Sequence, residues 1–108
     1  MQAELDVFSG RPNPTWDLSA EEVAALAPLL TGLPPSSVST EEGGLGYRGF
    51  LLSNPEGAAG LPARLRVGQG TVTIEAAGVS TFYRDAHGVE DHLLQQARKR
   101  GYGALLLP

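Results

Sequence analysis

A regular alternation of apolar and polar side chains in residues 63–76 constrains the fold more than any other feature. If Gln69 and Gly70 form a two-residue turn, apolar residues meet across a hairpin: Val67 opposite Val72, Leu65 opposite Ile74, and Ala63 opposite Ala76. The same register places charged and polar residues together on the other face: Arg64 opposite Glu75, and Arg66 opposite Thr73. A slip of one residue would mix the two faces, so the pattern predicts one antiparallel register.

Three more strands are expected around this hairpin. Residues 4–9 alternate like a strand, which the prolines of residues 10–14 interrupt. Residues 45–53 predict a second strand, followed by a turn at residues 54–57. A tight turn at Ala77 and Gly78 then allows a last strand over residues 79–84.

The signals for a first helix begin at Ser19. Ser19 and Glu22 have the spacing of a capping box, in which each side chain binds the backbone N–H of the other residue. An apolar stripe follows at helical spacing: Val23, Leu26, Ala27 and Leu30. Pro28 removes a helical hydrogen bond, so it is expected to kink or end the helix before Gly32.

A second helix is predicted over residues 85–100. Its first turns are acidic and its last turn is basic, as the helix dipole favours, and Gly101 suits the position after the helix end. Its expected buried stripe is Val89, Leu93 and Ala97. The apolar residues 104–107 are expected to form a short strand or to dock against a partner.

Together these elements predict a single α+β domain over residues 1–108. We expect an antiparallel sheet of four to five strands with two helices packed on one face, in the order strand, helix, strand, hairpin, helix. Residues 34–44 are polar and predict a mobile loop.

Composition excludes several function classes. The net charge is −4, which argues against nucleic acid as a partner. The chain has no cysteine, so disulfides and thiolate metal sites are excluded. No apolar run approaches the roughly 20 residues that cross a bilayer, and the acidic start does not resemble a signal peptide. We therefore expect a cytoplasmic protein with no membrane partner and no cofactor.

The first candidate site is the loop of residues 8–16, which two prolines make stiff. Arg11 offers a planar donor fork, Asn13 a donor and an acceptor, and Trp16 a stacking face. Such a loop suits recognition of a carboxylate, a phosphate or a peptide, because little entropy is lost on binding. The structural alternative is that Arg11 pairs with an acid such as Asp17 while Trp16 closes one end of the core.

Residues 5–16 (LDVFSGRPNPTW), together with the later LGYRGF of residues 45–50, resemble a family of small uncharacterised bacterial and fungal proteins. That family brings no known activity to this chain. The resemblance implies that the two segments form one feature. Tyr47 and Arg48 would then stand beside the Arg11 loop, as structural partners or as further ligand contacts.

The second candidate site is the segment of residues 85–92, which contains both histidines. If the helix includes His87, then His87 and Asp91 lie one turn apart and could ligate a metal, with Asp85 nearby. His92 would point elsewhere. The alternative is a helix start whose first turn is acidic for dipole reasons and whose histidines are solvated, with Gly88 delaying the helix past His87.

Three function classes remain open. The first is a non-enzymatic binding or accessory protein that recognises a protein or a small anionic or peptide ligand through Arg11, Asn13 and Trp16, with Tyr47 and Arg48. The second is a small metal-binding protein or hydrolase centred on the histidine segment. The third is an inhibitory or immunity-type partner acting through residues 1–54, which carry seven acidic and two basic side chains. Homo-oligomers through the apolar tail or the first strand also fit.

Overall fold

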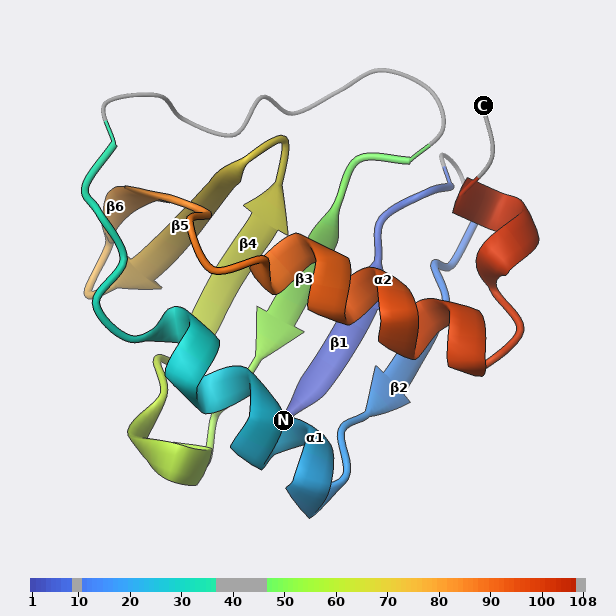
Figure 1. Cartoon of the computed structure of the whole chain (residues 1–108), viewed down its shortest axis with the longest axis horizontal. Coiled ribbons are helices and arrows are strands. Elements are labelled where there is room, and N and C mark those ends of the chain that lie inside the picture. The colour runs from blue at the N-terminus through green and yellow to red at the C-terminus, as the bar shows by residue number, and fades with distance from the viewer. Residues whose placement is uncertain (9–10, 37–46, 107–108) are drawn as a thin grey trace.

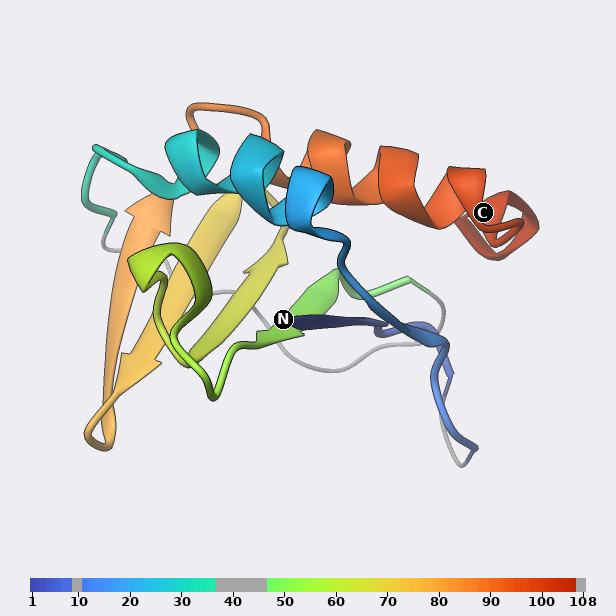
Figure 2. The ribbon, with the colours of Figure 1, turned by 90° about the horizontal axis from the view of Figure 1, so that it is seen from below.

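The alternating segments of the sequence form one antiparallel sheet in the computed structural model, which describes residues 1–8, 11–36 and 47–106. Both helices lie on the same side of the sheet (Figures 1 and 2). The strands are β1 (Gln2–Leu5), β2 (Thr15–Asp17), β3 (Phe50–Ser53), β4 (Arg64–Gly68), β5 (Thr71–Ala76) and β6 (Val79–Arg84); the helices are α1 (Ala20–Leu26) and α2 (Val89–Lys99). The predicted α+β class is confirmed, and the sheet has six strands instead of four to five because β2 was not expected.

The strand order is β2-β1-β3-β4-β5-β6, with every neighbouring pair antiparallel. The predicted register of the β4–β5 hairpin is confirmed from Arg64–Glu75 to Val67–Val72. Gln69 and Gly70 both have positive φ, as in the turns that match the twist of a two-residue hairpin. Ala63 lies outside β4, so its expected partnership with Ala76 is not part of the ladder.

The first strand ends earlier than predicted. β1 stops at Leu5, because the backbone N–H groups of Val7 and Phe8 donate to the side chain of Asn13 instead of to another strand. β2 is only three residues long and pairs with β1, which the proline-rich sequence in front of it concealed. The ladder that β1 and β3 share positions the loop that follows β1.

β3 is shorter than the predicted strand over residues 45–53, of which residues 45–46 lie outside the described part. The backbone N–H of Asp6 donates to the carbonyl oxygen of Gly49, and the carbonyl oxygen of Asp6 accepts from the N–H of Arg48. Two residues, Arg48 and Gly49, thus oppose the single residue Asp6 in a β-bulge. Gly49 has a φ of +105°, and a Cβ added there would lie 2.3 Å from the carbonyl oxygen of Val67. The bulge therefore requires glycine at this position.

The start of α1 agrees with the prediction, since Ser19 and Glu22 form the full capping box. Pro28 ends the α-helix, and the chain continues as a short 3₁₀ helix, η1 (Ala27–Leu30). Residues 34–36 of the expected loop lie along β6, where Pro35 bridges to Tyr83. Residues 37–44 of that loop lie outside the described part.

The prediction that α2 begins at residue 85 is wrong. Gly88 takes a left-handed conformation, with a φ of +77°, and the helix begins at Val89. The carboxylate of Asp85 accepts hydrogen bonds from the backbone N–H groups of Val89 and Glu90, so it satisfies the first turn from outside the helix. The predicted stripe is confirmed, because its three members are fully buried: Val89, Leu93 and Ala97.

The C-terminal segment is a 3₁₀ helix, η3 (Gly103–Leu106), and not a strand. Leu105 and Leu106 are partly buried and pack against the core of the same chain, while Leu107 lies outside the described part. The main core lies between the sheet and the helices, and its largest fully buried apolar side chains are Phe50, Leu5, Leu26, Leu52 and Leu93. Within the described ranges, no helix has the length and hydropathy needed to cross a membrane.

Candidate functional site

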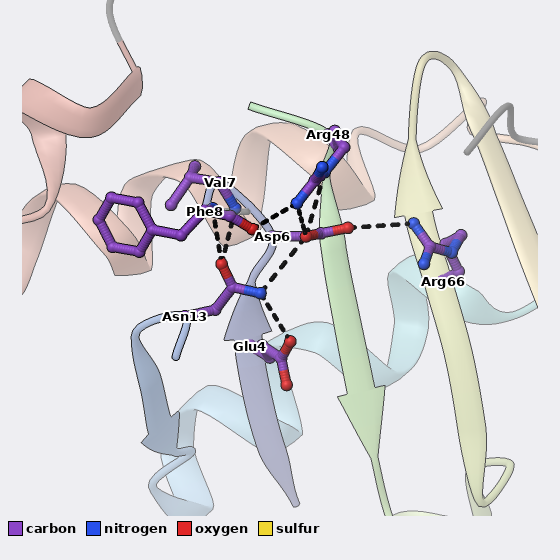
Figure 3. Close-up of polar contacts among 7 residues, drawn as sticks. All are labelled: Glu4, Asp6, Val7, Phe8, Asn13, Arg48 and Arg66. Atoms are coloured by element: carbon purple, nitrogen blue, oxygen red, sulfur yellow. Dashed lines mark hydrogen bonds and ion pairs between the residues drawn. The ribbon is translucent and has the colours of Figure 1, made fainter. Parts of the chain in front are cut away.

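Polar side chains gather at the end of β1, where the sheet meets the loop of residues 8–16 (Figure 3). We call this group the Asp6 cluster: Glu4, Asp6, Asn13, Arg48 and Arg66. The Asp6 carboxylate lies at its centre. One oxygen accepts from Arg48 at 2.8 and 3.2 Å, and the other lies 3.5 Å from Arg66. These three side chains are only 12–17% exposed, so their charges are largely removed from water, and both guanidiniums face the single carboxylate of Asp6.

Asn13 ties the loop to β1. Its Oδ1 accepts from the N–H groups of Val7 and Phe8 at 3.0 and 2.8 Å, and its Nδ2 donates to Glu4 at 2.9 Å and to Asp6 at 3.3 Å. All four contacts are made by one half-buried amide. Asn13 therefore holds the loop, and its donors and acceptor are occupied within the chain.

Arg48 joins the second motif to this loop. Besides the contacts with Asp6, its guanidinium donates to the carbonyl oxygen of Phe8 at 2.6 Å. The expectation that residues 5–16 and 45–50 form one feature is thus confirmed for their described residues. Arg48 acts in it as a structural partner of the loop.

Arg11 has a different environment, because it is exposed. Its guanidinium carbon lies 3.8 Å from the centroid of the Phe8 ring, so the cation is stacked on an aromatic face. The alternative pairing of Arg11 with Asp17 is not observed between these two described residues. The loop thus presents a guanidinium whose position is set by stacking, and among the described residues none accepts a hydrogen bond from it.

Trp16 points into the core, on the side of the helices. It is 7% exposed, and its Nε1 donates to Oε1 of Gln96 on α2 at 3.0 Å. Its ring stacks on Tyr102 at a centroid distance of 5.9 Å, and Arg100 lies 5.4 Å from it. This placement agrees with the structural alternative, in which Trp16 closes one end of the core.

Among the described residues, Tyr47 contacts α2 and Phe50 and not the Arg11 loop. Its hydroxyl donates to the carboxylate of Glu90, and its ring packs edge-on against Phe50. Burial and the neighbouring Glu90 carboxylate raise the pKa of Tyr47 well above its usual range. Tyr47 therefore remains protonated and connects the start of β3 with the start of α2.

The histidine segment lacks the geometry predicted for metal binding. His87 precedes α2, and its Nδ1 lies 3.1 Å from the carbonyl oxygen of Leu29, so the condition for one-turn spacing with Asp91, a helix that includes His87, is not met. Asp85 is engaged at the start of the helix. Among the described residues, no three His, Cys, Asp or Glu side chains are placed to hold one metal ion. The acidic first turn agrees with the alternative of a dipole-stabilised helix start.

Sequence reasoning missed three members of the Asp6 cluster, which lie in or beside predicted strands: Glu4, Asp6 and Arg66. It also gave no role to Gln96, the partner of Trp16. Gln96 is 4% exposed and links Trp16 with His92. A buried amide on a helix carries no local signal, because its partner Trp16 is 80 residues away in the chain.

Comparisons with known proteins add no assignment to this geometry: no protein-family model matches the chain, and searches of curated proteins and of solved structures found no similar protein.

Proposed function

We propose that this chain is a non-enzymatic binding protein that recognises a carboxylate-bearing segment of a partner protein through Arg11. The observation that carries the proposal is the contrast between the arginines of the loop region. Arg48 is committed to the loop itself, whereas Arg11 is exposed and stacked on Phe8.

The chemistry of a stacked guanidinium favours a carboxylate. Its planar fork matches two carboxylate oxygens, and the paired hydrogen bonds are charge-assisted. The loop beneath it is held by Asn13 and Arg48, so little conformational entropy is lost when a ligand binds. In this proposal Asn13, Arg48, Trp16 and Tyr47 position the loop and the sheet end, and Arg11 makes the contact.

The test is a selection from a displayed library of random peptides, followed by calorimetric titration of the recovered peptides. We expect enrichment of Asp, Glu or a free C-terminal carboxylate. Arg11→Ala should weaken binding about tenfold or more, as expected for loss of a charge-assisted pair. The matched control is Arg64→Ala, because Arg64 is 73% exposed and its contact with Glu75 is a long one, at 3.7 Å. Peptides that bind Arg11→Ala as tightly as the natural chain would refute the proposal.

The inhibitory-partner hypothesis makes a different prediction. It requires fast, salt-sensitive association governed by the acidic side chains of residues 1–54, with little dependence on Arg11. Because salt weakens charged contacts in both cases, the two classes are separated by the Arg11→Ala titration: only the carboxylate site depends on Arg11.

A further inference from the structure

The strand that follows the Arg11 loop has backbone groups that face outward. Ladder hydrogen bonds on both sides of Trp16 define its orientation: Leu5 N to Pro14 O, and Leu18 N to Met1 O. Because hydrogen-bonded pairs alternate along an antiparallel ladder, Trp16 directs its N–H and C=O toward β1, and Thr15 and Asp17 direct theirs away. Both residues are exposed, and no hydrogen bond within the described chain uses these outward groups.

The other edge strand of the sheet, β6, is partly covered by another segment of the same chain. At β6, the N–H of Ser36 donates to the carbonyl oxygen of Phe82 and the N–H of Arg84 donates to that of Pro34, so residues 34–36 cover the C-terminal half of that edge. Unpaired edges are the places where a sheet accepts a further strand. Of the two edges, β2 is the one where two consecutive outward-facing residues stay unpaired in the described structure, and it directly follows the Arg11 loop.

Charge distinguishes the two ends of this edge. Asp17 is exposed at the C-terminal end of β2. Beyond the N-terminal end lies Arg11, stacked on Phe8. The Phe8 ring extends to the side of β1 on which β2 lies, away from β3 (Figure 3). The edge is therefore positive beyond its N-terminal end and negative at its C-terminal end.

We propose that the β2 edge binds an extended segment of the partner protein as a seventh, antiparallel strand. This inference rests on the proposed function and specifies its ligand. An antiparallel segment runs opposite to β2, so its C-terminal part lies toward Arg11 and its N-terminal part toward Asp17. Charge complementarity then requires a basic residue early in the segment, opposite Asp17, and an acidic residue later, facing Arg11.

The probe is the acetylated and amidated hexapeptide Val-Lys-Val-Thr-Val-Glu. In the proposed register its lysine lies opposite Asp17 and its threonine opposite Thr15, with the glutamate toward Arg11. N-methylation of the second and third valines, whose N–H groups face away from β2, prevents the peptide from pairing with itself. The control is the same peptide in reversed order, Glu-Val-Thr-Val-Lys-Val, which exchanges the two charges.

Binding is measured by NMR on the natural chain. We expect the largest amide shifts in residues 11–18, and amide exchange at Thr15 and Asp17 slowed about tenfold or more on saturation. The reversed peptide should bind at least about threefold more weakly, because it places like charges together at both ends. These readouts need no variant, so they do not depend on a mutant folding. No binding at millimolar peptide, or binding without protection of these amides, overturns the inference.

Two substitutions at one position separate backbone pairing from charge. Asp17→Pro removes the outward N–H, and an extended residue such as Trp16 tolerates a following proline. Asp17→Asn keeps the N–H and removes only the charge. We expect Asp17→Pro to weaken binding about three- to tenfold beyond Asp17→Asn, the range of one hydrogen bond. If Arg11→Ala abolishes binding while Asp17→Pro equals Asp17→Asn, the carboxylate site stands and strand addition is refuted. The converse result refutes the role of Arg11 and supports the strand.

Discussion

Replacing Asn13 tests how the loop is held, because one side chain makes four hydrogen bonds there. Asn13→Ala leaves the N–H groups of Val7 and Phe8 without their acceptor and removes the donor shared by Glu4 and Asp6. Each lost backbone bond costs about 0.5–1.5 kcal/mol, and the contacts to carboxylates cost somewhat more. For a half-buried group we expect the free energy of unfolding to fall by about 2–4 kcal/mol, a large part of the stability of a small domain.

Asn13→Asp distinguishes the acceptor from the donor. The introduced carboxylate still accepts from the two N–H groups, but it stands beside the carboxylates of Glu4 and Asp6, where the amide had donated. Repulsion from those acids raises the pKa of the introduced group in the folded state above its unfolded value. Its protonated form can donate as the amide does. The loss of stability is therefore present above the raised pKa and decreases as the pH falls below it.

The assay is urea unfolding of both variants at pH 7 and pH 4.5, followed by circular dichroism and by the fluorescence of Trp16. The control is Arg11→Ala, since the same loop then loses only an exposed stacking contact, worth about 0.5–1 kcal/mol. The reasoning is refuted if Asn13→Ala costs no more than this control. If Asn13→Asp loses the same free energy of unfolding at both pH values, repulsion from Glu4 and Asp6 is not the cause of the loss.

Two further predictions concern the frame around the site. Gly49→Ala should lower the free energy of unfolding in urea by about 2–5 kcal/mol, because the new Cβ meets a carbonyl oxygen and φ is positive. The control Gly57→Ala also has a positive φ but no atom within 4 Å, so it should lower the same free energy by about 1–2 kcal/mol. Equal losses in the two variants would contradict the bulge argument. The hydrogen bonds from Arg100 lower the pKa of Glu22 from 4.5 to about 2, so this ion pair stabilises the fold above about pH 4.5 and its contribution is lost as the pH falls toward 2. Glu22→Gln keeps the capping box and removes only the ion pair, so the free energy of unfolding should fall by about 1–2 kcal/mol at pH 7. Measured by unfolding between pH 7 and pH 2, this loss should shrink as the pH falls. A loss that does not change with pH would exclude the ion pair as its cause.

The candidate site was only partly predictable. Arg11 and Asn13 are predicted from guanidinium and amide groups that lie beside prolines, whereas Arg48 is predicted only through the family resemblance; the structure places Asn13 and Arg48 in one polar cluster. Which of these side chains holds the loop and which stays exposed depends on contacts between segments about 40 residues apart, such as Arg48 with Asp6. Residue types and spacing do not reveal which arginine forms ion pairs and hydrogen bonds within the chain and which remains exposed.

Local structure in this chain follows from residues that are close together in the sequence. The β4–β5 register follows from a period-two pattern around one turn, and the start of α1 follows from side chains three residues apart. The energies involved act within a few residues, so they can be inferred from spacing alone. The buried stripe of α2 belongs to the same class, since helical periodicity selects its members.

Contacts between separate segments account for the elements that are too short or too polar to form by themselves. β2 has three residues beside a proline and exists because β1 pairs with it. Gln96 is buried because Trp16, 80 residues away in the chain, reaches it. In both cases the stabilising partner is supplied by another segment of the chain, and its contribution exceeds the local preference that the sequence displays.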